Sequence, residues 1–130
     1  MAGRAMRICG FAAGLALVAG VAACVPATNL PANCSDPAVS FSATLSAGGM
    51  QPAQFDVCRD QEVTITVATQ VAGELHFHGY DDELDEQPIT AGQSLTVKFK
   101  ATHPGQFPIE LHPEDGSDER EVAALVVHER

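Results

Sequence analysis

The stretch that decides the fold lies near the middle of the chain and reads Glu74-Leu75-His76-Phe77-His78-Gly79-Tyr80-Asp81. Apolar and polar residues alternate in it with the period of two that is typical of a β-strand. Residues two apart in a strand point to the same face of the sheet, so His76 and His78 are expected side by side. Two neighbouring imidazoles at the start of a strand predict a metal site.

Further strands are predicted on both sides of this segment. The clearest one covers residues 62–68, where Val63, Ile65 and Val67 alternate with polar residues. Similar alternation marks residues 39–45, 53–58, 93–101, 106–111 and 122–127. Turn residues recur every eight to twelve positions and no helical period of useful length is present, which predicts an all-β fold of about seven to eight strands, either a β-sandwich or a Greek-key barrel.

The first residues have the pattern of an export signal. Arg4 and Arg7 precede the apolar run 11–21, which is too short for a stable membrane-spanning helix. The segment Val21-Ala22-Ala23-Cys24 resembles a bacterial lipobox, in which the cysteine is acylated. We expect a lipoprotein signal peptide at 1–23 and an acyl anchor on Cys24 that holds the protein at the extracytoplasmic face of the membrane. The alternative is an ordinary signal peptide that contains a cysteine.

The domain organisation follows from composition. Residues 24–37 are rich in Pro, Ala and Asn and predict a tether, and residues 38–130 predict one folded domain. Without residues 1–23 the chain has five Lys/Arg against seventeen Asp/Glu, a formal charge of −12. This charge argues against nucleic acid and anionic lipid headgroups as partners, because phosphate binding needs clustered cations.

Two cysteines remain for the folded domain if Cys9 leaves with the signal peptide and Cys24 is acylated. An even pair in an exported protein predicts a disulfide between Cys34 and Cys58. The alternative is a structural zinc site, but these two cysteines lack the close Cys-x-x-Cys spacing of such sites.

The order of several short motifs resembles a cupredoxin-like domain over residues 38–130. The alternating strand 62–68 is followed by Leu75-His76-Phe77, by Thr90-Ala91-Gly92-Gln93-Ser94 and by Pro104-Gly105-Gln106-Phe107. This set is similar to the copper domain of cytochrome c oxidase subunit II, and more similar to the cupredoxin-like domains of bacterial exported lipoproteins. The resemblance implies a copper site at one end of a Greek-key sandwich.

The copper ligands of that family are only partly present. His76 matches the first histidine ligand, but the position of the copper-binding cysteine is taken by Leu111, and the second histidine position falls near Glu114. No methionine follows Met50. The resemblance therefore implies a site without the thiolate that blue copper centres require, and we expect no blue-copper electron transfer.

The histidines that remain define the candidate site. If the strand that begins at His76 and the strand that ends near Leu111 are antiparallel neighbours, His76 and His112 lie at the same end of the sandwich. The candidate ligands for Cu(II) or Zn(II) are His76, His78 and His112, with Glu110 or Glu114. In the alternative, His78 faces the core, His112 points away from His76, and the protein binds no metal.

Two function classes stay open. One is a lipid-anchored metal-binding protein that stores or hands over copper or zinc outside the cytoplasm, and the other is a metal-free interaction module with a protein partner in the cell envelope. The sequence contains no Ser-His-Asp order, paired catalytic carboxylates, glycine-rich phosphate loop or Cys-His pair, which predicts that the protein is not an enzyme. His103 and His128 are expected to lie away from the site, on the surface.

Overall fold

The computed structural model describes residues 30–130. The expected signal peptide 1–23, the lipidation site Cys24 and residues 25–29 of the expected tether lie outside the described residues. Within residues 30–130, no helix is long and apolar enough to cross a membrane.

The described residues form one short 3-10 helix and nine strands. These elements are η1 (Ala32–Ser35), β1 (Ala38–Ser46), β2 (Gly49–Gln51), β3 (Gln54–Cys58), β4 (Glu62–Thr69), β5 (Gly73–Phe77), β6 (Gln87–Ile89), β7 (Ser94–Lys100), β8 (Gly105–Pro113) and β9 (Arg120–His128).

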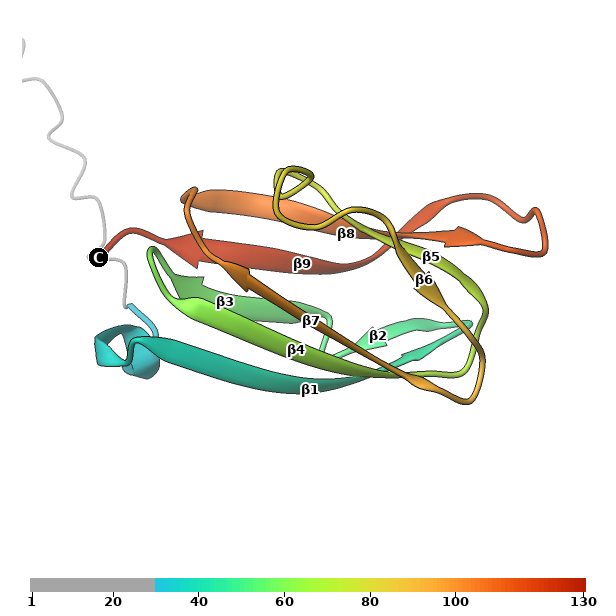
Figure 1. Cartoon of the computed structure of the whole chain (residues 1–130), viewed down its shortest axis with the longest axis horizontal. Coiled ribbons are helices and arrows are strands. Elements are labelled where there is room, and N and C mark those ends of the chain that lie inside the picture. The colour runs from blue at the N-terminus through green and yellow to red at the C-terminus, as the bar shows by residue number, and fades with distance from the viewer. Residues whose placement is uncertain (1–29) are drawn as a thin grey trace, which may run out of the picture.

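The strands make two sheets that face each other (Figure 1). One sheet has the order β2-β1-β4-β7 and the other has the order β3-β9-β8-β5-β6. The pairs β1·β4 and β3·β9 are parallel although the other neighbours are antiparallel. Between the parallel strands β1 and β4 the chain passes through β3 in the other sheet, a crossing that is typical of the Greek-key β-sandwich that the resemblance implies.

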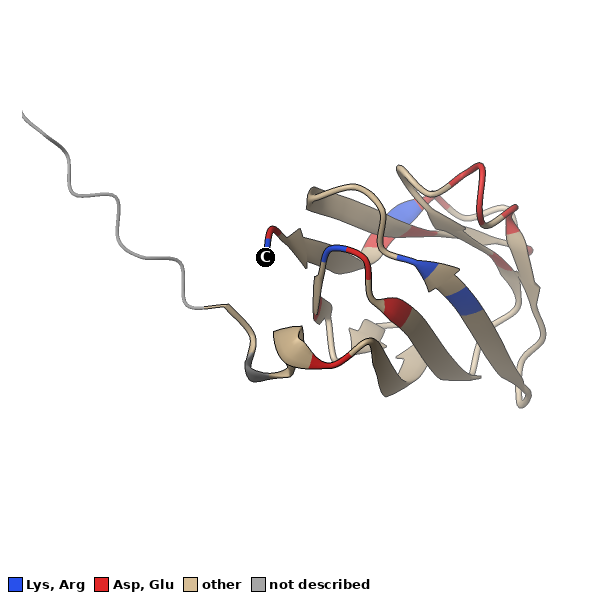
Figure 2. Cartoon of the chain, turned by 60° about the vertical axis from the view of Figure 1, so that its left-hand side comes forward, with Lys and Arg blue, Asp and Glu red and all other residues tan. Residues whose placement is uncertain are grey.

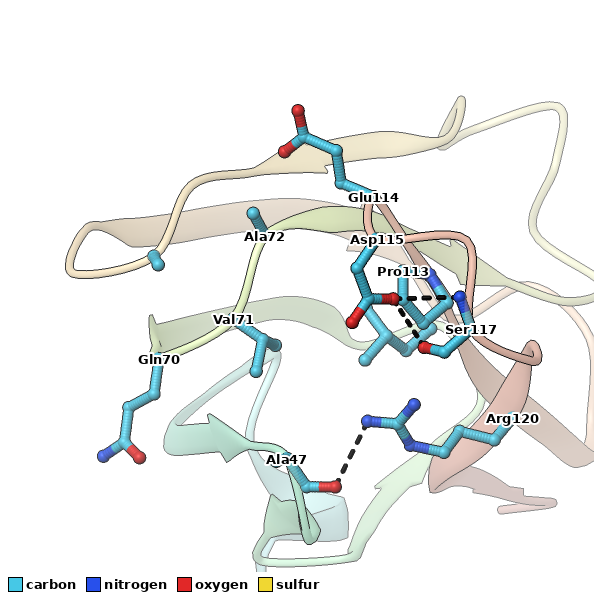
Figure 3. A pocket seen from close by; sticks show the side chains of 11 residues that line it. Ala47, Gln70, Val71, Ala72, Pro113, Glu114, Asp115, Ser117 and Arg120 are labelled. Atoms are coloured by element: carbon cyan, nitrogen blue, oxygen red, sulfur yellow. Dashed lines mark hydrogen bonds between the residues drawn. The ribbon is translucent and has the colours of Figure 1, made fainter.

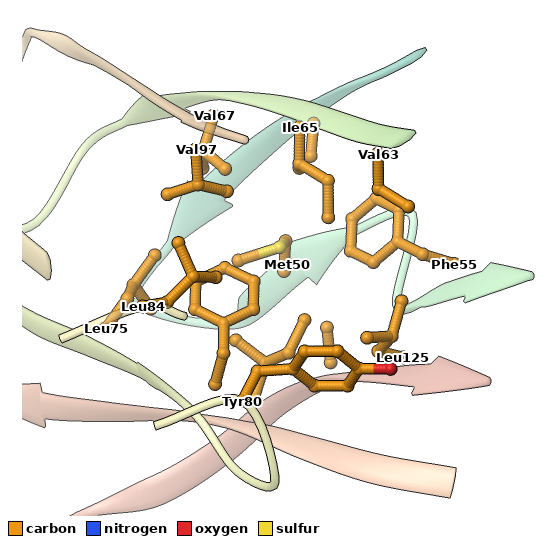
Figure 4. Packing of buried hydrophobic residues seen from close by; sticks show 14 of the residues in the cluster. Met50, Phe55, Val63, Ile65, Val67, Leu75, Tyr80, Leu84, Val97 and Leu125 are labelled. Atoms are coloured by element: carbon orange, nitrogen blue, oxygen red, sulfur yellow. The ribbon is translucent and has the colours of Figure 1, made fainter. Parts of the chain in front are cut away.

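The core lies between the sheets and explains the alternation seen in the sequence. Val63, Ile65 and Val67 of β4 point inward from one sheet, and Leu75 and Leu125 point inward from the other (Figure 4). Their exposed fractions are at most 1%. Burial of such side chains supplies most of the free energy that favours folding.

The strand predictions hold with two omissions and one shift. The short strands β2 and β6 were not predicted, since three residues are too few to show a period, and the predicted turn at Gly48-Gly49 includes the first residue of β2. The strand that carries the quoted histidines is β5, which starts at Gly73, so His76 is its second-last residue and His78 follows its end. The prediction that His76 opens this strand was therefore wrong, because Gly73 and Glu74 already pair with β8.

The segment before β1 is held against the turn between β3 and β4. The disulfide between Cys34 and Cys58 is present, with the two Cα atoms 5.3 Å apart, as the cysteine count predicts. The fully buried side chain of Gln61 accepts a hydrogen bond from the Cys58 amide at 2.7 Å and donates to the carbonyls of Asn33 and Asp36 at 2.7 and 2.9 Å. Residues 33–36, which the sequence assigns to the tether, are thus fastened to the sandwich.

We expect the disulfide to contribute measurably to stability. Replacing Cys34 and Cys58 together by alanine opens a loop with a sequence separation of 24. The chain-entropy relation predicts a loss of about 3 kcal/mol in the free energy of unfolding. Urea denaturation of the variant and of the oxidised protein measures this loss. The reduced wild-type protein should match the variant, and equal stability of the oxidised and reduced proteins would contradict the prediction.

Candidate metal centre

The pairing of β5 with β8 brings the histidines to one surface. The register sets Leu75 opposite Leu111, His76 opposite Glu110, and Glu74 opposite His112. Directly opposite residues share a face, so Leu75 and Leu111 point into the core while the polar residues of both strands point outward. The candidate site therefore lies on the outer face of the five-stranded sheet.

Two glycines allow the strands and the following turn to approach closely. Gly73 has a φ of 150°, and a Cβ atom built there would collide with the carbonyl oxygen of His112. Gly79, directly after His78, has a φ of 76°, and its missing side chain leaves room for the ring of Phe107. Both positions favour glycine in backbone conformation and in space.

Three of the five histidines, namely His76, His78 and His112, come together on this surface, which we call the histidine face. The ring centroids of His76 and His78 are 4.2 Å apart, and those of His76 and His112 are 5.8 Å apart at an interplanar angle of 88°. The side chains are partly exposed, at 20% for His76, 37% for His78 and 23% for His112. His78 does not face the core, and His112 does not point away from His76. The orientations that the metal-free alternative assigned to these two side chains are therefore wrong.

Carboxylates surround these rings. Oε2 of Glu110 lies 2.7 Å from Nε2 of His78 and 3.9 Å from Nε2 of His112. On its other side, Nδ1 of His112 lies 3.7 Å from Glu86 and 3.8 Å from Glu119. Nε2 of His76 contacts Asp81. His76, Glu86 and His112 can each direct one ligand atom to a common point, since these three atoms lie within 4.8 Å of one another.

Two ring nitrogens lack hydrogen-bond partners among the described residues. Nε2 of His78 and Nε2 of His112 are both shielded from solvent, and neither makes a hydrogen bond. Nε2 of His78 nevertheless lies 2.7 Å from Oε2 of Glu110, the contact that lowers the pKa of this carboxyl. A buried polar atom without a partner is costly. The group formed by His76, Glu86 and His112 offers nitrogen and oxygen donors for one cation, so these residues fit a metal.

The ionisation of the carboxylates also suits metal binding. Contact with the His78 ring lowers the pKa of Glu110 below its usual range, helped by the nearby rings of His112 and His76. Contact with the His76 ring lowers the pKa of Asp81. Glu110 and Asp81 are therefore ionised at neutral pH. Ionised carboxylate is also the form of these side chains that binds a metal ion.

The sequence predicted part of this arrangement. His76, His78, His112 and Glu110 were proposed from it and lie together, whereas Glu114 has no ion-pair contact with these rings. Glu86 and Glu119 were missed. Glu86 belongs to an acidic run that looks like a solvated loop, and only the pairing of β6 with β5 brings it to His76 and His112.

The other two histidines lie elsewhere. Nδ1 of His103 is 2.9 Å from the Thr102 hydroxyl, and its carbonyl accepts the Tyr80 hydroxyl at 3.0 Å. His128 is 2.8 Å from Asp56 on the strand pair β3·β9. Leu111, the position of the copper-binding cysteine by resemblance, is fully buried and points away from the histidine face.

Comparison with known proteins gives the fold but no sequence relative. No protein-family profile and no curated protein matches the chain. Among solved structures, the chain is similar to the multicopper oxidase mgLAC with a TM-score of 0.55 at 19% identity, covering 72% of this chain and 39% of that one. The blue copper oxidase from Nitrosomonas europaea gives a TM-score of 0.57 at 17% identity, with the same coverage of 72% and 39%.

A small copper protein is similar over most of its length. The solution structure of a copper binding protein in its apo form gives a TM-score of 0.54 at 10% identity and covers 72% of this chain and 90% of that one. The fold is cupredoxin-like. The cupredoxin-like chain spans about two fifths of the two oxidases, and at these identities the similarity concerns the fold alone.

The contact between His78 and Glu110 can be tested by titration. We expect His78→Asn to raise the pKa of Glu110 toward its ordinary value, because the variant removes the main contact that favours the carboxylate. The stabilisation from this depressed pKa is present above the ordinary glutamate pKa and is lost as the pH falls through the lower folded value. Carboxyl-carbon NMR of the metal-free protein measures the titration.

His128→Asn is the matched control for this titration and should leave Glu110 unchanged, because His128 contacts Asp56 instead. An unchanged Glu110 pKa in His78→Asn would show that the contact does not form in solution.

Proposed function

We propose that this cupredoxin-like protein binds a divalent metal ion on its histidine face and stores it or hands it over. The observation that carries the proposal is the convergence of three imidazoles, with the Nε2 atoms of His78 and His112 shielded from solvent and without hydrogen-bond partners. The similarity to copper proteins in fold is consistent with this function. The proposal is of a binding protein and not of an enzyme.

The donor set favours Cu(II) or Zn(II). Imidazole nitrogens and carboxylate oxygens are ligands of intermediate and hard character, which suit these ions better than Cu(I). Both cysteines of the described residues are joined in the disulfide, so neither supplies a thiolate. We therefore propose a site that differs from a blue copper centre and does not carry electrons.

We further propose that the protein acts outside the cytoplasm, fixed to the membrane by acylated Cys24. The basic residues, the apolar run and the lipobox-like segment of the first 24 residues support this location. An exported protein also meets the oxidising conditions in which the disulfide forms.

Metal binding is tested by titrating the exported Cys24→Ser protein with Cu(II) and with Zn(II) in a calorimeter. We expect His76→Ala and His112→Ala each to weaken binding by more than about tenfold, since a lost ligand costs at least as much as a lost residue that only holds a ligand in place by a hydrogen bond. Affinity should also fall in acid, because protonated imidazole does not bind metals.

The control for this experiment is His103→Ala, which removes an imidazole outside the histidine face. Its affinity should equal that of the parent protein. Affinity that is insensitive to both site substitutions would remove the proposed site, and a protein that binds neither ion would favour the metal-free interaction module.

The anchor is tested with the full chain in a bacterial host. We expect the protein in the membrane fraction with an acylated N-terminal cysteine, and we expect Cys24→Ser to move it to the soluble fraction, because the acyl chains supply the membrane affinity. Cys9→Ser is the control and should stay in the membrane fraction. A Cys24→Ser protein that remains membrane-bound would disprove lipid anchoring through this residue.

A further inference from the structure

A second feature lies beside the histidine face, on the far side of His112 from His76. It is a pocket of about 570 Å³, a volume within the range of roughly 300–1,000 Å³ that is usual for ligand sites. The pocket is lined by Gly73, Glu74, Pro88, Ile89, His112, Pro113, Glu114 and Glu119. These residues come from β5, β6, β8 and the loop that follows β8.

The pocket combines apolar walls with negative charge. Pro88, Ile89 and Pro113 supply the apolar surface. Glu74, Glu114 and Glu119 supply three carboxylates, and no Lys or Arg lines the pocket. Among the described residues, Glu74 and Glu114 make no ion pair, and Glu119 contacts only the ring of His112. This negative charge has no cation to balance it within the pocket.

The adjoining pocket differs in charge. It shares Pro113 and Glu114 with the first, has a volume of about 450 Å³ and is lined mainly by small and apolar residues (Figure 3). Its Arg120 donates a hydrogen bond to the Ala47 carbonyl at 3.2 Å and helps to lower the pKa of Asp115, which is held down mainly by hydrogen bonds from Ser117. Arg120 offsets part of the negative charge there, so the pocket beside His112, with three carboxylates and no Lys or Arg, suits a cation better.

We propose that this pocket receives a Lys or Arg side chain of a protein that docks on the histidine face. Such a side chain carries a cationic head on a methylene stem, and the pocket offers carboxylates for the head and prolines and an isoleucine for the stem. Glu86 adds a further carboxylate 3.7 Å from His112, whereas Lys98 and Lys100 lie on β7 in the opposite sheet (Figure 2). Charge complementarity of this kind favours a basic partner.

Docking in this pocket would bring the partner next to His112. The inference deepens the proposed metal function, because a partner held there could deliver or collect the ion, but binding of the side chain itself needs no metal. The test therefore uses the metal-free protein, so that its outcome is separate from the outcome of the metal titration.

The experiment titrates the ¹⁵N-labelled, metal-free Cys24→Ser protein with blocked peptides and follows amide chemical shifts. The probes are acetyl-Ala-Lys-Ala-amide and the same peptide with Arg in place of Lys. A third peptide with norleucine in place of Lys has a similar methylene stem but no charge. We expect saturable shifts at Gly73, Glu74 and His112 with the two basic peptides only. The variant Glu74→Gln/Glu114→Gln should bind them about fivefold more weakly, as the loss of two exposed charge contacts implies.

The matched control is Asp36→Asn/Glu62→Gln, which removes the same charge from a distant part of the sandwich and should bind as the parent does. Equal weakening in the two variants would overturn the proposal in favour of a general charge effect. Equal binding of the norleucine peptide, or the absence of saturable shifts, would also overturn it. If free pentylamine bound and the peptides did not, the pocket would take a small organic cation and not the side chain of a docking protein, which would overturn the proposal.

Discussion

The register between β5 and β8 is the constraint on which the site depends. Leu75 and Leu111 face each other in the core, and this pairing turns His76, Glu110 and His112 outward together. A slip of one residue in either strand would bury a charged or polar side chain and expose a leucine, at a cost of several kilocalories per mole. Burial of the leucines on one face thus fixes the positions of the ligands on the other.

Most of the carboxylates around the histidines lie on loops, whereas His76 and His112 lie on strands. These strands are the paired β5 and β8, whereas Asp81, Glu86 and Glu119 lie outside the strands and converge from two loops. The lowered pKa values of Asp81 and Glu110 show that contact with the imidazoles favours the ionised carboxylates. With nitrogen donors on strands and oxygen donors on loops, a metal ion could bind without rearranging the sheet, since side chains on strands are placed more precisely than side chains on loops.

Local alternation made most of the sandwich predictable, because each long strand buries every second residue, as β4 does with Val63, Ile65 and Val67. The same rule placed His76 and His78 on one face. It could not place Glu86 or Glu119, since their positions depend on the short strand β6 and on the hairpin between β8 and β9, and neither has a period. The shared face of His76 and His112 required the register, which depends on contacts between distant segments.

The two ends of the sandwich carry different features. The chain enters at the end where η1 is joined to Cys58 and where the C-terminus also lies, whereas the hairpin between β8 and β9 lies at the opposite end (Figure 1). His112 is the second-last residue of β8, and Glu119 is the last residue of that hairpin's connection. An anchor at Cys24 would therefore hold the disulfide-bonded end toward the membrane, and the histidine face with its acidic pocket would stay accessible to a metal ion and to a basic partner.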